Sequence, residues 1–292
     1  MALSAEEFVE NLRKADFAVE DWTSLGSGQS NLAILANDEW VLRTAIHDEG
    51  TTRFEFEVDV IRRIHERLPV HSPHPELVVD VPGCSSPVMG YRFISGTILK
   101  RDQLSELDGS KRRRLGNELG RILIRLHSIS PAQMSGSHTH LVDTEDQWNA
   151  MMNDSVELLK PRVERDVWNR INRKLKKSLN RISRYEFEPV LRHGDFGAGN
   201  FLFDDKDRIV GLIDFDSAGF GDPAIDVAGV ISSTTPPGIL LDPMSQTYSL
   251  TDEIVERART YRETFPLQQA LLGAKTDDEI AIENGLDGYM TT

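Results

Sequence analysis

The stretch that decides the fold is LRHGDFGAGNFLFDDKDRIVGLIDFDSAGFGDPAID, residues 191–226. The triplet His193-Gly194-Asp195 is followed five residues later by Asn200, and Asp214 comes nineteen residues after Asp195. Phosphoryl transfer from a nucleotide needs groups in this order. One carboxylate orients the attacking hydroxyl, while an amide oxygen and a second carboxylate hold the Mg²⁺ that bridges the phosphates.

The residues between these groups predict a β-hairpin. Phe201–Phe203 and Ile209–Ile213 are apolar and read as strands, and the polar run Asp204–Asp207 reads as the turn between them. A hairpin of this kind brings Asn200, before its first strand, close to Asp214, after its second. The alternative is a polar hairpin whose acids are only solvated.

Together with Gly221-Asp222-Pro223 and Asp226, the stretch resembles the signature of the aminoglycoside phosphotransferase family. That family is similar to choline kinases, homoserine kinases and macrolide phosphotransferases, and is a branch of the protein-kinase-like fold. The resemblance implies an α+β, bilobal protein-kinase-like fold. A small β-rich N-lobe that binds nucleotide would span residues 1–95, and a larger, mainly helical lobe for catalysis and substrate binding would span residues 96–292.

The resemblance also implies roles for single residues. Asp195 would be the catalytic base, and Asn200 and Asp214 would be the magnesium ligands. His193 and Asp226 would brace the catalytic loop, with Asp226 acting from the helix that follows Pro223.

The N-terminal part reads as a helix, Ala5–Lys14, followed by a β-meander with a glycine-rich connection. In such a connection, backbone N–H groups approach phosphate oxygens without hindrance from side chains. Most stretches of this kind are ordinary hairpin turns, but this one precedes a strand that ends in a cation. The candidate nucleotide-binding residues here are Gly26, Ser27, Gly28 and Ser30.

The cation is Arg43, within Trp40–Thr44, where most kinase-like proteins carry a Lys that contacts the phosphates. Arginine keeps the charge and binds phosphate as a fork, so the electrostatic role is retained while the geometry changes. By resemblance, Glu57 in the amphipathic helix expected at Arg53–Leu68 pairs with Arg43. The alternatives are Glu55 as the partner, a surface role for Glu57, or a degenerate nucleotide site.

The run Val88–Gly96 reads as a strand that enters a glycine turn, and it resembles the family's hinge between the lobes. This hinge, at about 91–96, would offer backbone groups of Arg92 and Ile94 to the purine. It places the predicted domain boundary near Ser95.

Further helices are expected at Ser110–His127, Asp146–Leu159, Pro161–Ile182, Pro223–Ser232, Thr251–Thr264, Pro266–Leu272 and Thr276–Asn284, with a strand at Leu77–Val81. The basic residues between Lys160 and Arg184 have one interleaved Trp and no nucleic-acid-binding motif, so they read as a solvated helix face.

The formal charge of −14 also argues against a nucleic-acid-binding protein. From Asp195 to the end, eighteen Asp and Glu stand against six Lys and Arg, a net charge of −12. A cleft lined by one sign of charge attracts ligands of the other sign, which favours a cationic acceptor over a merely solvated acidic surface. Candidate acids for recognising its amines are Glu263, Asp277, Asp278 and Glu283.

Composition favours a cytoplasmic protein that has no membrane partner. Cys84 is the single cysteine, so no intrachain disulfide forms. The N-terminus lacks the basic start and apolar run of a secretory signal, and no stretch of about 20 apolar residues predicts a membrane span. We expect a monomer or weak dimer.

The sequence therefore predicts a small-molecule kinase that moves the γ-phosphate of ATP or GTP to a hydroxyl, with Mg²⁺ as cofactor. The expected acceptor is an aminoglycoside, which would make the protein an antibiotic-resistance enzyme. The alternatives are a macrolide kinase, a metabolic kinase for a choline-, homoserine- or sugar-type substrate, and a catalytically silent nucleotide-binding protein.

Overall fold

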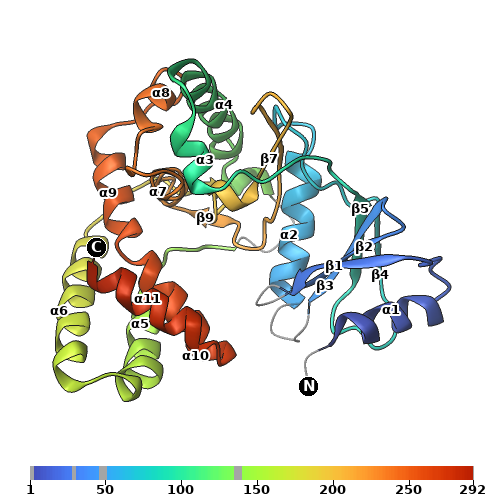
Figure 1. Cartoon of the computed structure of the whole chain (residues 1–292), viewed down its shortest axis with the longest axis horizontal. Helices are drawn as coiled ribbons and strands as arrows, with labels where there is room; N and C mark the ends of the chain where they lie inside the picture. The colour runs from blue at the N-terminus through green and yellow to red at the C-terminus, as the bar shows by residue number, and fades with distance from the viewer. Residues whose placement is uncertain (1–2, 28–30, 46–50, 135–139, 292) are drawn as a thin grey trace. The chain divides into compact units, whose positions relative to one another are not determined.

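The computed structural model describes residues 3–27, 31–45, 51–134 and 140–291, which form two compact units (Figure 1). The first unit comprises Met1–Leu99, Met134–His140 and Gly199–Ala218. The second comprises Lys100–Gln133, Leu141–Ala198 and Gly219–Thr292. This division differs from the boundary predicted near Ser95, because residues 199–218 belong with the N-terminal residues.

A five-stranded antiparallel sheet forms the centre of the first unit, in the order β1-β2-β3-β5-β4. Its strands are β1 (Trp22–Ser27), β2 (Asn31–Ala36), β3 (Trp40–Ala45), β4 (Leu77–Val79) and β5 (Val88–Arg92). The first three form the predicted meander. The fourth is shorter than the strand expected at Leu77–Val81, and β5 ends before the expected Gly96.

Helix α1 (Ala5–Lys14) lies against this sheet (Figure 1). The Ser4 hydroxyl accepts a hydrogen bond from the Glu7 N–H at 3.1 Å, and the Glu7 carboxylate accepts one from the Ser4 N–H at 2.9 Å. This reciprocal cap fixes the helix start. The buried face of the helix carries Phe8, Val9 and Leu12, which pack against Leu32, Ile34, Ala36, Leu42 and Val88.

Helix α2 spans Thr51–Ile64, so it begins two residues before and ends four residues before the predicted Arg53–Leu68. The residue that precedes a proline is disfavoured in helical conformation, and Leu68 precedes Pro69. The chain therefore leaves the helix through a turn in residues 65–68.

The predicted hairpin is present as β7 (Phe201–Phe203) and β8 (Ile209–Leu212). Four backbone hydrogen bonds of 2.9 Å attach this hairpin to residues 71 and 97 of the first unit. His71 donates to Val210 and accepts from Leu212, while Thr97 and Phe203 each donate to the other. These bonds are the physical reason why residues 199–218 group with the N-terminal residues.

The second unit is mainly helical. Its helices are α3 (Arg101–Glu106), α4 (Gly109–His127), α5 (Glu145–Asp154), α6 (Arg165–Ile182), α7 (Ala224–Ser232), α8 (Leu241–Ser245), α9 (Asp252–Arg262), α10 (Phe265–Thr276) and α11 (Glu279–Thr291). Two three-residue strands, β6 (Val190–Arg192) and β9 (Gly219–Gly221), pair antiparallel. Short helical turns lie at Pro131–Met134, Ser155–Leu159, Lys160–Arg162 and Ala198–Asn200.

Several predicted helix bounds were wrong. Helix α5 ends at Asp154, and the chain continues as a π-helical turn. Pro161 lies in a 3₁₀ turn, so α6 begins only at Arg165. The last two helices are longer than predicted. Helix α10 continues to Thr276 because the stop is provided by Asp277, whose φ of 55° is left-handed.

Helices α10 and α11 lie side by side (Figure 1) and share a core with α5 and α6. The fully or nearly buried side chains of this core include Leu159, Trp168, Ile171, Leu175, Leu267, Leu271, Ile282 and Tyr289. The buried positions of α6 follow the helical period, so most of its basic residues lie on the exposed side, as predicted; Lys174 is half-buried and donates to the Tyr289 carbonyl at 2.5 Å.

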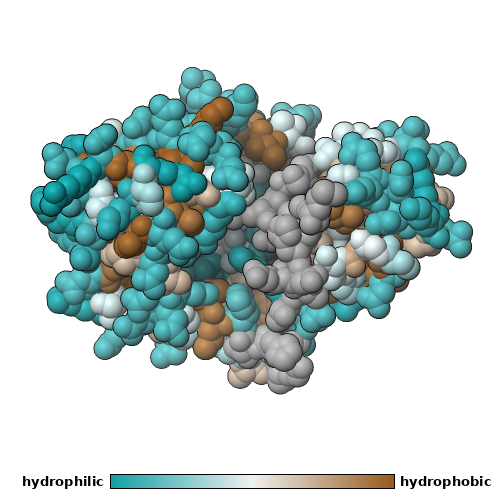
Figure 2. Space-filling view, turned by 90° about the horizontal axis from the view of Figure 1, so that it is seen from below, coloured by the Kyte–Doolittle hydropathy of each residue, from teal (hydrophilic) through white to brown (hydrophobic). Residues whose placement is uncertain are grey.

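Hydrophilic residues cover most of the described surface in the view of Figure 2, with apolar residues scattered among them. Among the residues that the structure describes, no helix combines the length and the apolar composition of a membrane span.

Candidate active site

The loop that carries His193 and Asp195 is held by a carboxylate of α7. Asp226 is completely buried, and its two oxygens accept the backbone N–H groups of His193 at 2.9 Å and Gly194 at 2.8 Å. These are the contacts that the bracing role requires of Asp226. A carboxylate that accepts two successive backbone N–H groups fixes the path of the chain between them.

The same carboxylate contacts a second helix. Nε2 of His127, at the end of α4, lies 3.0 Å from Asp226 Oδ2, and its Nδ1 lies 2.8 Å from the Tyr248 hydroxyl. Burial by itself raises the pKa of Asp226, but the His127 hydrogen bond and the nearby His127, His193 and Arg192 outweigh it and hold the pKa below the ordinary value. Asp226 is therefore an ionised group at neutral pH.

Within the loop, His193 and Asp195 occupy different environments. His193 is completely buried, and its Nδ1 accepts the backbone N–H of Asp195 at 3.3 Å. Asp195 itself is exposed. This arrangement suits His193 as a positioning residue and leaves Asp195 as the side chain able to meet an acceptor hydroxyl.

Sequence reasoning missed a charged network around this loop. Arg192 binds the Asp143 carboxylate through two hydrogen bonds of 2.7 and 2.8 Å, and the same carboxylate accepts the Asp222 N–H at 3.1 Å. Asp222, also completely buried, receives two hydrogen bonds from Arg257, at 2.7 and 3.0 Å. A third comes from the Tyr261 hydroxyl at 3.0 Å. The Gly221-Asp222-Pro223 motif was the signal, but its partners lie 79 and 35 residues away.

In the first unit, Arg43 connects the two acids expected near the phosphates. Its Nη1 lies 2.5 Å from Glu57 Oε1, and its Nη2 lies 3.2 Å from Asp214 Oδ1. The predicted ion pair between Arg43 and Glu57 is therefore present. Both side chains are buried, whereas the Asp214 side chain is 46% exposed, so one end of this triad remains open to a ligand.

Burial shapes the electrostatics of this triad. It disfavours the charged Arg43, yet Glu57 and Asp214 more than compensate and raise the pKa of its guanidinium. Burial also raises the pKa of Glu57 to about 7, while Arg43 opposes the rise. Arg43 is thus a permanent cation whose principal partner titrates near neutrality.

The predicted metal ligands lie at one end of the β7–β8 hairpin. Phe201 pairs with Leu212, and the Ile213 N–H donates to the Asn200 carbonyl at 3.0 Å. Asp214 follows directly with a left-handed φ of 64°, a conformation that is rare outside glycine and is found at functional sites. Asn200 is buried beside it.

The donor set of these two residues fits magnesium. Their side-chain oxygens are hard ligands, and Mg²⁺ in nucleotide sites usually takes only one or two protein ligands, with phosphates and waters completing its shell. Within the described ranges, no group of three or more His, Cys, Asp or Glu side chains is arranged to hold a metal ion.

The structure describes only two of the four residues predicted in the glycine-rich connection. Gly28 and Ser30 lie outside the described residues. Gly26 and Ser27 lie in β1, where their backbones pair with Ala33 and Leu32 after an irregularity in the register.

The residues of the predicted hinge also make contacts that the sequence did not indicate. The Phe93 N–H donates to the Glu39 carbonyl at 2.8 Å, one residue beyond the end of β5. The Arg92 side chain pairs with the carboxylates of Glu39 and Glu76 and lies 4.1 Å above the Trp40 ring. Ile94 is half-buried and lines a cavity.

Two of the four candidate acids for amine recognition, Glu263 and Asp278, have side-chain partners within the fold. Glu263 lies 3.6 Å from Arg181 and accepts the Ser178 hydroxyl at 3.3 Å. Asp277 ends α10, and Asp278 accepts the Ala281 N–H at 3.0 Å at the start of α11. Glu283 is exposed.

A family model described as the phosphotransferase enzyme family matches residues 21–261. A viomycin phosphotransferase of Streptomyces vinaceus is 38% identical over 101 residues, which cover 33% of this chain and 34% of the relative. The match thus spans about a third of that relative.

Solved structures of phosphotransferases share the fold. The GDP and kanamycin complex of APH(2")-IIia superimposes with a TM-score of 0.84 at 18% identity, covering 97% of each chain. The macrolide 2'-phosphotransferase MphH of Brachybacterium faecium gives a TM-score of 0.67 at 16% identity, covering 97% of this chain and 98% of the other. The predicted protein-kinase-like α+β fold, with a β-rich part and a mainly helical part, is confirmed. Because the family model covers most of the chain, including the Asp195 loop and both predicted metal ligands, this protein belongs to the phosphotransferase enzyme family.

Proposed function

We propose that the protein transfers the γ-phosphate of ATP or GTP to a hydroxyl of a cationic antibiotic, with an aminoglycoside as the expected acceptor. The observation that carries this proposal is the Arg43 guanidinium held between Glu57 and Asp214, with Asn200 at the same hairpin end. A buried cation beside two metal-type ligands is an arrangement suited to a nucleotide's phosphates.

In the proposed reaction the first unit binds the nucleotide. Arg43 contacts the phosphate oxygens, and Glu57 keeps its fork oriented. Asn200 and Asp214 would hold Mg²⁺, which when bound supplies positive charge that neutralises the phosphate oxygens. Backbone groups of Arg92 and Ile94 are proposed to contact the purine of the nucleotide. The glycine-rich residues Gly26–Asn31 are proposed to contact its phosphates.

The second unit supplies the catalytic base, Asp195. The Asp195 carboxylate accepts a hydrogen bond from the acceptor hydroxyl, directs its oxygen toward the γ-phosphorus and takes its proton as the new bond forms. Asp226 keeps the loop in the conformation that presents Asp195. Positioning and charge stabilisation account for most of the rate enhancement, since phosphoryl transfer asks little covalent chemistry of the protein.

The nature of the acceptor is proposed from charge and from the relatives. Residues 195–292 carry a net charge of −12, which favours a cationic ligand. Similar proteins are named for viomycin, or were crystallised with kanamycin, gentamicin or streptomycin. A cytoplasmic location, a resistance role and a monomer or weak dimer remain predictions from the sequence.

A phosphate-transfer screen tests the proposal. Purified protein with Mg²⁺ and either ATP or GTP is incubated with kanamycin, gentamicin, streptomycin, viomycin, a macrolide, choline and homoserine, and phosphorylated product is measured by mass spectrometry. The expected result is transfer to at least one of the four cationic antibiotics.

The variant Asp195→Asn provides the matched control. It should bind nucleotide as the wild type does and lose most turnover, because the amide does not take the proton. Transfer only to a macrolide, choline or homoserine would refute the proposed acceptor class. Nucleotide binding without transfer to any acceptor would identify a catalytically silent nucleotide-binding protein.

A further inference from the structure

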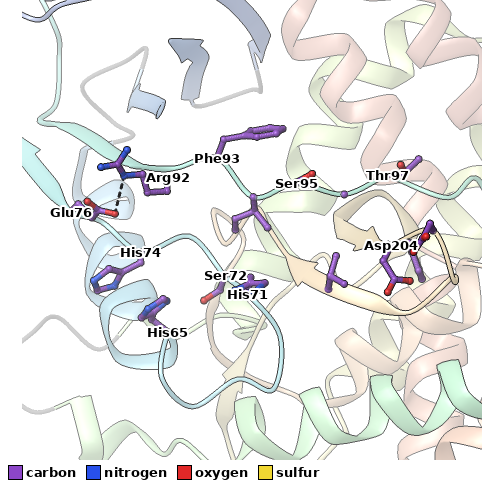
Figure 3. A pocket seen from close by; sticks show the side chains of 15 residues that line it. His65, His71, Ser72, His74, Glu76, Arg92, Phe93, Ser95, Thr97 and Asp204 are labelled. Carbon is purple, nitrogen blue, oxygen red and sulfur yellow. Dashed lines mark ion pairs between the residues drawn. The ribbon is translucent and has the colours of Figure 1, made fainter. Parts of the chain in front are cut away.

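The first unit contains a cavity of about 840 Å³ (Figure 3) whose described lining includes none of Arg43, Glu57 and Asp214, although it includes Arg92 and Ile94, whose backbone groups are proposed to contact the purine. It is bordered by the end of α2, the segment before β4, the residues that follow β5, and the β7–β8 hairpin. Its lining includes Ser72, Glu76, Arg92, Ile94, Asp205 and Val210. The volume lies within the range of small-molecule sites, about 300–1,000 Å³.

This cavity is separate from the Arg43 triad. Directly opposed residues of antiparallel strands point to the same face of a sheet, and neighbouring residues along a strand alternate. Arg92 opposes Trp40, whereas Arg43 opposes Met89, so Arg92 and Arg43 lie on opposite faces. The cation–π contact between Arg92 and Trp40 agrees with this assignment.

Two buried polar atoms of the cavity lack a hydrogen-bond partner among the described residues. Ser72 is 4% exposed and its Oγ is unpaired, as is Nδ1 of His65. The His65 ring stacks on His74 with centroids 4.0 Å apart. Burial and the neighbouring His74 lower the pKa of His65, so its ring is neutral and the unpaired Nδ1 presents a lone pair if the other nitrogen carries the proton. An unpaired buried polar group destabilises the fold, and a ligand with N–H donors would remove that cost.

The charged groups of the lining favour a cation. Three carboxylates, Glu76, Asp204 and Asp205, stand against the single guanidinium of Arg92, which Glu39 also neutralises. Arg208 binds Asp204, whereas Asp205 is exposed at the hairpin turn. A negative lining on a protein of net charge −14 attracts positive ligands.

The acids lie at opposite ends of the cavity. Figure 3 shows Glu76 beside Arg92 at one end and Asp204 at the other, with Ser95 and Thr97 along the strand-like segment between them. The lining also contains the apolar Ile94, Phe203 and Val210. A lining with acids at both ends and apolar residues besides matches a molecule whose charged groups are joined by an apolar chain.

We propose that this cavity binds a linear polyamine, with one ammonium group near Glu76 and Ser72, another near Asp205, and the alkyl chain over Ile94 and Val210. This assignment does not depend on the proposed catalytic activity.

Spermidine binding to the full-length protein, measured by isothermal titration calorimetry at low and at physiological salt, tests the proposal. We expect one spermidine per chain and at least a tenfold weaker affinity in the double variant Glu76→Gln/Asp205→Asn. The matched control Asp80→Asn, which removes an exposed acid outside the cavity, should bind as the wild type does. The variant Asp195→Asn should also bind normally.

A second variant separates ligand binding from a structural role. Ser72→Ala removes an unpaired buried hydroxyl, so it should leave the melting temperature unchanged or higher without ligand, yet weaken spermidine binding. Several sites per chain, equal losses in Asp80→Asn and the double variant, or loss of binding only in Asp195→Asn would overturn the proposal. So would a Ser72→Ala protein that is destabilised and binds spermidine as tightly as the wild type.

Discussion

Replacing Asp226 by Asn tests whether one buried carboxylate fixes the catalytic loop. Asp226 accepts the N–H groups of His193 and Gly194 through different oxygens, and His127 lies 3.0 Å from one of them. An amide retains one acceptor oxygen, while its NH₂ group faces an N–H donor. One charge-assisted hydrogen bond is lost and a buried N–H is left unpaired, which together cost about 2–4 kcal/mol.

For a chain of this size, that loss lowers the melting temperature by about 3–7 °C. Thermal unfolding followed by circular dichroism measures the shift. Turnover should fall at least tenfold because the Asp195 loop is no longer held, which the transfer assay measures. Asp287→Asn, on the exposed face of α11, is the matched control and should unfold as the wild type does.

The pH dependence gives an independent readout. The pKa of Asp226 is depressed in the folded protein, so around pH 4 the folded chain binds fewer protons at this site than the unfolded chain. Its stabilising contribution is present above the ordinary carboxyl pKa and is lost as the pH falls below about 4. The difference in melting temperature between wild type and Asp226→Asn should therefore shrink on acidification. A variant within 1 °C of the control at pH 7, or a difference that grows toward pH 3, would refute the reasoning.

Four further predictions follow from the same contacts. Arg257→Met leaves the buried Asp222 without its cationic partner and should lower the free energy of unfolding by about 3–5 kcal/mol, with partial recovery in Arg257→Met/Asp222→Asn; urea denaturation measures both. Arg43→Lys keeps the charge but does not reach Glu57 and Asp214 together, so the nucleotide KM should rise about tenfold or more in steady-state assays; an unchanged KM would count against a phosphate contact. Burial raises the pKa of Glu57 to about 7, so its protonation loosens the Arg43 fork and nucleotide affinity should fall as the pH drops through 7; the fall should be smaller in Glu57→Gln, as fluorescence titration would show. A chelator of divalent ions should abolish turnover, and added Mg²⁺ should restore it; full activity in the chelator would exclude the proposed metal role.

Much of the local structure could be predicted because it is encoded by neighbouring residues. Ser4 and Glu7 signal the start of α1, and the apolar runs on either side of Asp204–Asp207 signal the β7–β8 hairpin. The pairing of Arg43 with Glu57 followed from a family resemblance, since nothing in the local pattern distinguishes Glu57 from Glu55.

The rest depends on contacts between residues far apart in the sequence. Strand β9 is three residues long and contains two glycines, so it shows no periodicity, and it forms only because β6 lies beside it. Asp143 lies outside every helix and strand predicted from the sequence, yet its carboxylate binds Arg192, 49 residues away. A pattern search over short windows does not detect such partners.

The four backbone bonds that attach the β7–β8 hairpin have a consequence for the synthesis of the chain. Residues 1–99 leave the ribosome about 100 residues before the hairpin does, so until then the backbone groups of His71 and Thr97 have no strand to bond. Residues 1–99 therefore cannot complete their folding until the hairpin has been synthesised. A gene fragment that stops at residue 99 would yield an aggregation-prone product.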